Sequence, residues 1–367
     1  MQVNWRWISA GRNTFAVLYA ACELDGFTLM PVESPAADVT CYSLNSINAP
    51  AFRDEIRSAG CLTIVGGPHA TACPEEVAGY ADYVITGEGE YVLPRLLADI
   101  RDGGDGRIPG VMTADWFEPA RTNVRLDAYP AFSTMRGYVE ITRGCPFSCG
   151  YCQTPRIFGS CMRHRSIDGV ARFANRHSQS RFVTPNAFAY GSDGISPRWE
   201  KIERLFKACT REIYFGTFPS EVRPEFICNE SLGLVNRYCA NKKIHFGAQS
   251  GSETVLTEIR RGHTTGDVLR AYDLCREYAF IPVVDFIVGL PSETDEDQRS
   301  TLRLIREIAR HGIVHVHRFI PLPGTSLGGT VARDILPEIE KELGNLALRG
   351  KLTGAWNDPA VRFFRLT

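Results

Sequence analysis

The stretch GYVEITRGCPFSCGYCQTP, residues 137–155, joins a strand-like run to a loop that carries three cysteines. Cys145, Cys149 and Cys152 follow the spacing C-x3-C-x2-C, with Tyr151 beside the last of them. With 12 cysteines in the chain, a triplet of this spacing arises by chance roughly one time in a hundred. Thiolates bind iron–sulfur clusters and zinc. We therefore predict a metal centre with one open position; the alternative is a zinc site completed by a distant His or Cys.

Further strand patterns follow this stretch, each separated from the next by a helical pattern such as residues 252–262 or 265–279. Together with the first strand they make six β/α units, which predict a partial (β/α)6 barrel over residues 136–324. In that architecture functional groups gather at the carboxyl ends of the strands. The later strand patterns cover residues 181–188, 211–219, 242–251, 281–291 and 314–324.

The first hundred residues also alternate strand and helix, which predicts an N-terminal doubly wound parallel sheet over residues 1–104. Pro31 indicates that its strand lies at a sheet edge. The Gly-, Pro- and Asp-rich segment 105–135 is predicted to be a linker. Residues 325–367 are predicted to form a C-terminal extension of one helix and a tail, with residues 350–356 as a possible lid.

The composition excludes several classes of protein. The net charge of −1 provides no basic field for nucleic acid, and no apolar run approaches the length of a membrane span. The first residues lack the pattern of a signal peptide. We expect a cytoplasmic α/β protein that binds neither nucleic acid nor membrane, and whose other nine cysteines are mostly buried thiols.

The cysteine loop resembles the radical S-adenosylmethionine (SAM) superfamily. The resemblance implies that Cys145, Cys149 and Cys152 hold a [4Fe–4S] cluster and act in catalysis through it. It also implies that SAM binds the open iron, that Tyr151 lies by the adenine, and that ferredoxin or flavodoxin donates electrons.

The same resemblance implies further SAM-binding positions at the ends of later strands. The usual Gly-Gly-Glu is absent from TPNAFAYGSDG (184–194), so the positions there are chosen by place alone. Arg223 suits the carboxylate of SAM, and the alternative to this role is a surface ion pair. The alternative for Val288 is a side chain of the apolar core that does not contact SAM. The implied positions are Pro185, Asn186, Ser220, Glu221, Arg223, Gln249, Ser250, Val288 and Gly289.

In the first domain, residues 64–90 resemble the cobalamin-binding domain that precedes the SAM domain in one radical SAM subclass. The alternative for Gly66 and Gly67 is a tight turn. No histidine occurs in ISAGRNTF (8–15), so the resemblance implies cobalamin without a histidine under the cobalt; loss of cobalamin is the alternative. The implied cobalamin-binding positions are Ser43, Leu44, Asn45, Gly66, Gly67, Pro68, His69, Gly87, Glu88 and Gly89.

The combined resemblance implies a cobalamin-dependent radical SAM C-methyltransferase acting on an unactivated sp3 carbon. The pattern is most similar to proteins of methanogenic archaea that C-methylate methyl-coenzyme M reductase, so a peptide or protein substrate, a glutamine of that enzyme first, is expected. A small-molecule or lipid precursor is the rival substrate. The alternative functions are a methylthiotransferase, which needs three more cysteines for a second cluster, and a non-catalytic sensor. Tyr190 and His317 are candidate substrate contacts, although the histidine also suits a structural role in its strand.

Overall fold

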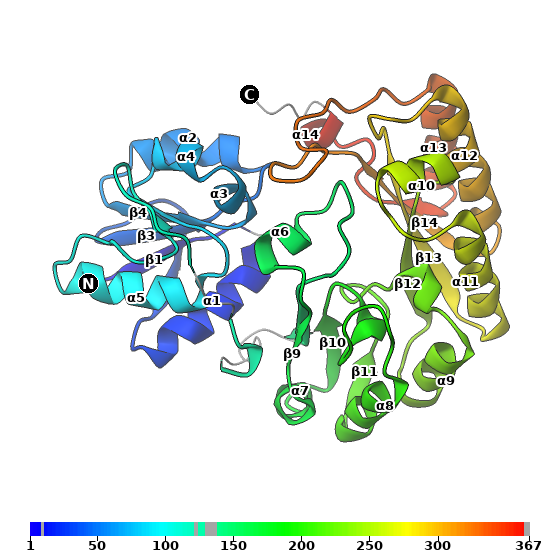
Figure 1. The fold of residues 1–367 in the computed structure, drawn as a ribbon, viewed down its shortest axis with the longest axis horizontal. Helices are drawn as coiled ribbons and strands as arrows, with labels where there is room; N and C mark the ends of the chain where they lie inside the picture. The colour runs from blue at the N-terminus through cyan, green and yellow to red at the C-terminus, as the bar shows by residue number, and fades with distance from the viewer. Residues whose placement is uncertain (9–10, 121–123, 129–137, 363–367) are drawn as a thin grey trace. The chain divides into compact units, whose positions relative to one another are not determined.

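The structure is a computed structural model that describes residues 1–8, 11–120, 124–128 and 138–362. The chain divides into two compact units (Figure 1). Unit 1 contains Met1–Arg136 with Arg156–Phe158, and unit 2 contains Gly137–Pro155 with Gly159–Thr367.

Unit 1 is built on a six-stranded sheet in the order β2-β1-β3-β4-β5-β6. All neighbours are parallel except β5 and β6, which are antiparallel. Pro31 lies in the edge strand β2, as predicted. β6 lies inside the segment predicted to be a linker. The strands are β1 (Val3–Arg6), β2 (Leu29–Val32), β3 (Val39–Ser43), β4 (Leu62–Gly66), β5 (Tyr83–Ile85) and β6 (Val111–Met112).

Helices cover both faces of this sheet. α1 (Arg12–Leu24) and α5 (Gly89–Arg101) share one apolar cluster with the sheet. The helices α2 (Ala49–Arg57), α3 (Pro68–Ala72) and α4 (Pro74–Ala78) contribute to a second cluster. The predicted doubly wound parallel sheet is therefore confirmed, with one antiparallel edge strand added to it.

Unit 2 contains two parallel sheets, in the orders β11-β10-β7 and β12-β13-β14-β15. The segment after β11 connects them, because the amide of His245 donates to the carbonyl of Gly216 at 2.9 Å and Val222 bridges to Phe246. The six predicted barrel strands therefore form an open barrel. The strands are β7 (Tyr138–Glu140), β10 (Gln179–Val183), β11 (Glu212–Tyr214), β12 (Lys243–Gln249), β13 (Ile281–Val288), β14 (Ile313–Arg318) and β15 (Leu352–Thr353). A separate short pair joins β8 (Thr142–Arg143) to β9 (Arg163–His164).

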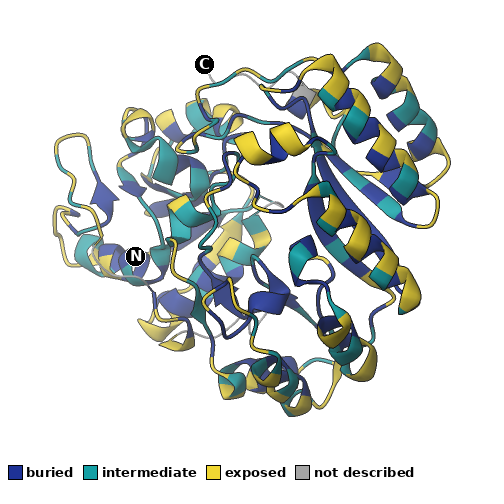
Figure 2. Ribbon diagram, turned by 45° about the vertical axis from the view of Figure 1, so that its right-hand side comes forward, coloured by how far each residue is buried: buried dark blue, intermediate teal, exposed yellow. Residues whose placement is uncertain are grey.

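Three helices, on residues 265–277, 295–309 and 337–348, cover the outside of the four-stranded sheet, with exposed outer sides and buried inner sides (Figure 2). The helix on residues 167–174 packs on β7 of the three-stranded sheet. β15 lies in the stretch suggested as a lid; this suggestion is wrong, since β15 extends the sheet beside β14. No helix in the described part of the chain is both long and apolar enough to span a bilayer. The helices that follow β8 are α6 (Thr154–Phe158), whose last three residues belong to unit 1, and α7 (Ile167–Ala174), α8 (Trp199–Ala208), α9 (Asn229–Tyr238), α10 (Glu253–Glu258), α11 (Thr265–Glu277), α12 (Asp295–Ala309), α13 (Pro337–Leu348) and α14 (Pro359–Arg362).

Candidate functional site

The cysteine loop follows β8 and is anchored at both ends. Gly144 has φ +86°, and a Cβ there would lie 2.2 Å from the carbonyl oxygen of Cys161, so the backbone requires glycine. The amide of Gly150 donates to Ile259 at 2.8 Å, and its carbonyl accepts from Leu327 at 3.0 Å. These contacts fix the loop against the end of α10 and against the chain after β14.

The three thiols differ in burial. Cys149 is 8% exposed, whereas Cys145 and Cys152 are half-buried. The amide of Cys152 donates to the carbonyl of Cys149 at 3.1 Å, so the second half of the motif forms a tight turn. Three thiols on one short turn match the donor set of an iron–sulfur cluster.

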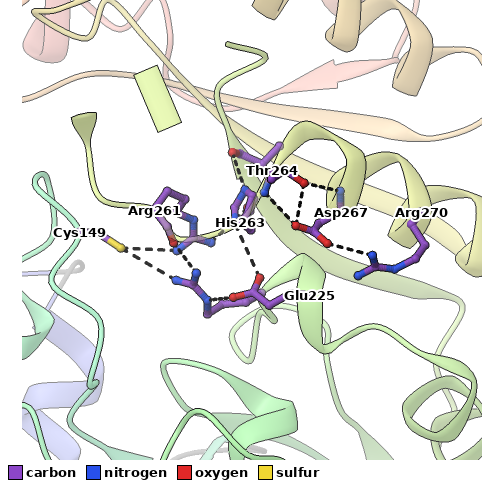
Figure 3. Close-up of polar contacts among 10 residues, drawn as sticks. Cys149, Glu225, Arg261, His263, Thr264, Asp267 and Arg270 are labelled. Carbon is purple, nitrogen blue, oxygen red and sulfur yellow. Dashed lines mark hydrogen bonds and ion pairs between the residues drawn. The ribbon is translucent and has the colours of Figure 1, made fainter. Parts of the chain in front are cut away.

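Two buried arginines lie against the middle cysteine. Nη1 of Arg261 is 3.8 Å from Sγ of Cys149, and Nη1 of Arg223 is 4.0 Å from the same sulfur (Figure 3). Arg223 stacks on Phe147, with 3.6 Å from its guanidinium carbon to the ring centroid. Arg223 is 4% exposed, so the surface ion pair considered for it is wrong. Two guanidinium groups here place positive charge beside the cysteine loop, which suits an anionic ligand.

The side chains behind these arginines hold them in place. Glu225 accepts from Nε of Arg223, and Nη2 of Arg261 donates to the carbonyl of Gly247 at 3.1 Å. Nε2 of His263 donates to Ala248 at 3.2 Å, while its Nδ1 is 3.7 Å from Glu225. Burial lowers the pKa of His263 to about 3, with help from both arginines, so the ring is neutral at pH 7.

The segment that carries Arg261 and His263 is also fixed by the start of α11. Thr264 and Asp267 form a capping box, with the Thr264 hydroxyl donating to Asp267 at 2.8 Å. Arg270 pairs with Asp267 at 2.9 Å, which holds the capping carboxylate (Figure 3). The helix start therefore positions the guanidinium group of Arg261 beside the cysteine.

Two carboxyl groups interact here, Asp285 in β13 and Glu221 in the segment after β11. Burial and the nearby Glu221 raise the pKa of Asp285 well above its ordinary value, and burial raises the pKa of Glu221. Oδ2 of Asp285 forms no hydrogen bond with any residue the structure describes. An unpaired buried carboxyl oxygen is costly, so it indicates a group that binds or protonates there.

Asn186 gives the same kind of signal. The side chain is 3% exposed, and neither its Oδ1 nor its Nδ2 has a hydrogen-bond partner within the described ranges. Its neighbour Pro185 is half-buried. A buried amide with both atoms unpaired fits a site that a polar ligand completes.

The other implied SAM positions already have partners within the protein. The Ser220 hydroxyl donates to Thr217 at 3.0 Å, and Ser250 is 3.2 Å from Thr301. The carbonyl of Gly289 accepts from Arg333 at 2.9 Å. Gln249 has φ +69°, Val288 is buried, and Tyr151 packs on an apolar cluster formed largely by α10. Their roles in SAM binding stay predictions.

In unit 1, the ends of three adjacent strands are tied together. The amide of Leu44 donates to Gly66 at 2.9 Å, and the amide of His69 donates to Leu44 at 3.0 Å. The Thr71 hydroxyl donates to the carbonyl of Gly67 and accepts from the amide of Gly87, both at 2.9 Å. The implied cobalamin positions after β3, β4 and β5 are thus brought together at one edge of the sheet, where doubly wound folds bind ligands.

Several side chains in this group serve local structure. Asn45 accepts from the amides of Ile47 and Asn48, and so holds the turn before α2. Glu88 accepts from Val124 at 3.1 Å. Ser43 ends β3, Pro68 begins α3 and Gly89 begins α5. His69 is 4% exposed and lies near Ser46, Cys73 and Glu76.

The two candidate substrate contacts lie in different settings. Tyr190 is fully buried, and its hydroxyl donates to the carbonyl of Arg165 at 2.7 Å, so it belongs to the core of unit 2. His317 is exposed and contacts His315, with 4.5 Å between ring centroids. His315 lies 2.7 Å from the Thr353 hydroxyl, which favours a structural role for that histidine.

Sequence reasoning missed Arg261, His263 and Asp285. The stretch RRGH at residues 260–263 carries two arginines and a histidine, which was the available signal. It follows a helix, so a search at strand ends passes over it. Asp285 was a charge within the apolar run PVVDFIV.

Residues 139–305 match the family model of the radical SAM superfamily. The matched region contains the cysteine loop, β10 to β13 and most of α12. The match implies a [4Fe–4S] cluster and SAM as the cofactors of this region.

Curated relatives are distant. An uncharacterized protein of Methanopyrus kandleri is 24% identical over 323 residues, covering 72% of this chain and 61% of that protein. The tRNA-2-methylthio-N(6)-dimethylallyladenosine synthase of Corynebacterium glutamicum is 27% identical over 290 residues, covering 73% of this chain and 53% of the enzyme. The chain thus spans between about half and three fifths of the length of these relatives.

Two solved structures share the fold. The radical SAM methyltransferase TsrM from Kitasatospora setae, with cobalamin and a [4Fe–4S] cluster bound, has a TM-score of 0.69 and 15% identity, covering 89% of this chain and 73% of that one. The cobalamin-dependent SAM radical enzyme OxsB, with aqua-cobalamin bound, has a TM-score of 0.65 and 15% identity, covering 95% of this chain and 55% of that one. At these identities the likeness establishes the α/β fold.

Proposed function

We propose that this chain is a cobalamin-dependent radical SAM C-methyltransferase that acts on an unactivated sp3 carbon. The single observation that carries the proposal is the cysteine loop. Three thiols follow the spacing of the superfamily, and two buried guanidinium groups lie within 4.0 Å of Cys149. The likeness of the fold to TsrM and OxsB supports the cobalamin part.

The described residues fit a [4Fe–4S] cluster and SAM. The three thiols would hold three irons, which leaves the fourth iron for SAM. Arg223 and Arg261 suit the SAM carboxylate, because guanidinium groups bind carboxylates in a planar fork. The unpaired amide of Asn186 and carboxyl of Asp285 can complete hydrogen bonds to the amino or hydroxyl groups of SAM.

The described residues of unit 1 also fit cobalamin. The turns after β3, β4 and β5 bring backbone amides and glycines to one edge of the sheet, and a Cβ at Gly87 would meet no atom within 4 Å. Such an edge lets the backbone approach a bulky ligand. We therefore assign cobalamin binding to the turn residues, with Gly66, Gly67 and Gly87 at its centre.

When bound, the cluster with SAM supplies radical hydrogen abstraction, and cobalamin supplies the methyl group. The chain's own part is to bind and orient. The arginines would hold the SAM carboxylate, and the unpaired polar groups of Asn186, after β10, and Asp285, in β13, would hold its remaining polar atoms. The apolar cluster around Tyr151 would exclude water from the reactive carbon.

For the substrate we propose a peptide or protein carbon, with a glutamine of methyl-coenzyme M reductase as the first candidate. The support is the resemblance of the sequence pattern to methanogen proteins that modify that enzyme. A small-molecule or lipid precursor is the rival, and ferredoxin or flavodoxin is the proposed electron donor.

A methylthiotransferase is the second candidate, favoured by the curated synthase relatives. That reaction needs a second cluster on three further cysteines. Cys22 and Cys41 are fully buried in the apolar core of unit 1, and burial raises the pKa of both thiols. Buried apolar thiols are poor metal ligands, so this candidate is weaker.

The test is anaerobic turnover of the reconstituted enzyme with SAM that carries a deuterated methyl group, a low-potential reductant and a glutamine peptide of methyl-coenzyme M reductase. Formation of 5′-deoxyadenosine together with a deuterated methyl group on carbon of the peptide would support the proposal. A methylthio group in the product would support the second candidate. Failure to cleave SAM under reduction would support a sensor.

A further inference from the structure

Three potential metal ligands of unit 1 lie together outside the sites described above. His69, Cys73 and Glu76 each offer one ligand atom, and these atoms all lie within 4.8 Å of one another. The spacing is His-x3-Cys-x2-Glu, and two short helices interrupted at Cys73, which has φ −132° and ψ 57°, bring the three side chains together. His69 lies in α3, Glu76 lies in α4, and Cys73 lies at the junction between the two helices.

The imidazole of His69 is prepared for a ligand at Nε2. The residue is 4% exposed, and Nε2 makes no hydrogen bond to any of the described residues. Nδ1 lies 3.3 Å from the Ser46 hydroxyl. Histidines that bind a metal through one nitrogen usually hydrogen-bond through the other, which fixes the tautomer and the ring orientation. Ser46 therefore supplies the expected second contact.

The carboxylate of Glu76 is oriented in the same way. Arg53 donates to Oε1 of Glu76, and its guanidinium carbon is 5.6 Å from the ring centroid of Tyr80. The second oxygen, Oε2, lies 3.5 Å from Nε2 of His69. In a tetrahedral zinc site with bonds of about 2.1 Å, two ligand atoms lie about 3.4 Å apart. These two atoms therefore already have the separation of a ligand pair.

We propose that His69, Cys73 and Glu76 form a zinc site. A nitrogen, a sulfur and a carboxylate oxygen are the donors that Zn²⁺ takes in proteins, with water at the fourth position. On binding, the Cys73 thiol releases its proton to solvent and the thiolate bonds to zinc. Cys73 is half-buried and Glu76 is exposed, which provides an entry path. The site assigns His69 to zinc rather than cobalamin, and it does not rest on the proposed function.

The test uses the 367-residue chain with Cys145, Cys149 and Cys152 replaced by serine, so that the cluster motif cannot bind zinc. The protein is prepared without cobalamin and titrated with Zn²⁺ against a chelating indicator, and separately with Co²⁺. Cobalt bound by a thiolate gives a charge-transfer absorption band, which a purely structural cysteine would not produce.

We expect about one Zn²⁺ per chain and a cobalt–thiolate band in the protein with the three serine replacements, which is the parent for the following variants. Cys73→Ser should abolish the band and raise the zinc Kd at least tenfold, and Ser46→Ala should raise it about 10- to 100-fold by loosening His69. Cys61→Ser, a half-buried cysteine of the same unit, is the matched control and should change neither. Thermal unfolding without metal checks that each variant folds. Zinc binding that is absent from the parent, unchanged in Cys73→Ser, or equally reduced in Cys61→Ser would overturn the site.

Discussion

Replacing Gly67 with alanine should locally destabilise the strand-end turns of unit 1. Gly67 has φ +100° and ψ −176°, a backbone region that is essentially restricted to glycine. A Cβ there would lie 2.7 Å from the carbonyl oxygen of Leu44 and 2.8 Å from its amide nitrogen. Backbone atoms cannot move aside as a flexible side chain can, so the turn after β4 must shift away from β3.

The magnitude follows from two contributions. The backbone region costs about 1–3 kcal/mol for a residue other than glycine. Moving Leu44 weakens its two hydrogen bonds, to Gly66 and from His69, by the equivalent of one bond in all, or about 1 kcal/mol. The sum is about 2–4 kcal/mol, a large share of the stability of an ordinary domain.

Gly87→Ala is the matched control, because Gly87 also has a positive φ, +75°, but its Cβ would meet no atom within 4 Å. It should cost about 1–2 kcal/mol. Hydrogen exchange read by mass spectrometry on peptides of β3 and β4 isolates unit 1 from the rest of the chain. A loss of 2–4 kcal/mol corresponds to exchange that is roughly 30- to 1,000-fold faster. If Gly67→Ala exchanges no faster than Gly87→Ala, the packing argument is wrong.

Three further predictions concern unit 2. Burial raises the pKa of Glu293 from 4.5 to about 7, so the free energy of unfolding falls as pH rises between these two values. Glu293→Gln does not titrate, so it should be more stable than the parent above pH 7, by on the order of 3 kcal/mol, and equal to it near pH 4.5. Urea unfolding measured across this pH range tests the prediction. Asn186→Leu should raise the free energy of unfolding by about 1–3 kcal/mol, because it removes an unpaired buried amide. The same variant should bind SAM more weakly in equilibrium dialysis. A destabilised variant would mean that the amide has partners. Arg261→Lys should keep the iron content and raise the SAM Kd at least tenfold. The reason is that an ammonium group cannot reach both Cys149 and Gly247 as the forked guanidinium group does. An unchanged Kd would show that Arg261 does not contribute to SAM binding.

The fold was largely predictable from sequence because strand and helix patterns alternate along most of the chain. The strand patterns from Val3 to Arg318 predicted the doubly wound sheet and the open barrel. β6 and β15 were missed, because each has two residues and is too short to show an alternating pattern. Their pairing depends on the position of the neighbouring strand, which is a tertiary effect.

The candidate site was predictable only in part. The cysteine triad was visible because three ligand residues lie close together in the sequence. The contact of Arg261 with Cys149 joins residues 112 positions apart, and it depends on the turn between α10 and α11. The glycine at position 67 was expected to admit a ligand or a tight turn, and the structure gives it a further reason, its close contact with the backbone of Leu44.

If one chain binds both a cluster and cobalamin, metal analysis of anaerobically purified protein will show both metals. With cobalamin supplied, we expect about four irons and about one cobalt per chain, together with the absorption spectrum of protein-bound cobalamin. Cys149→Ala should lose the iron and keep the cobalt, because the two sites use different residues. Four irons without cobalt would contradict the methyltransferase account and leave a radical SAM enzyme whose first unit has another role. About eight irons without cobalt would indicate the methylthiotransferase.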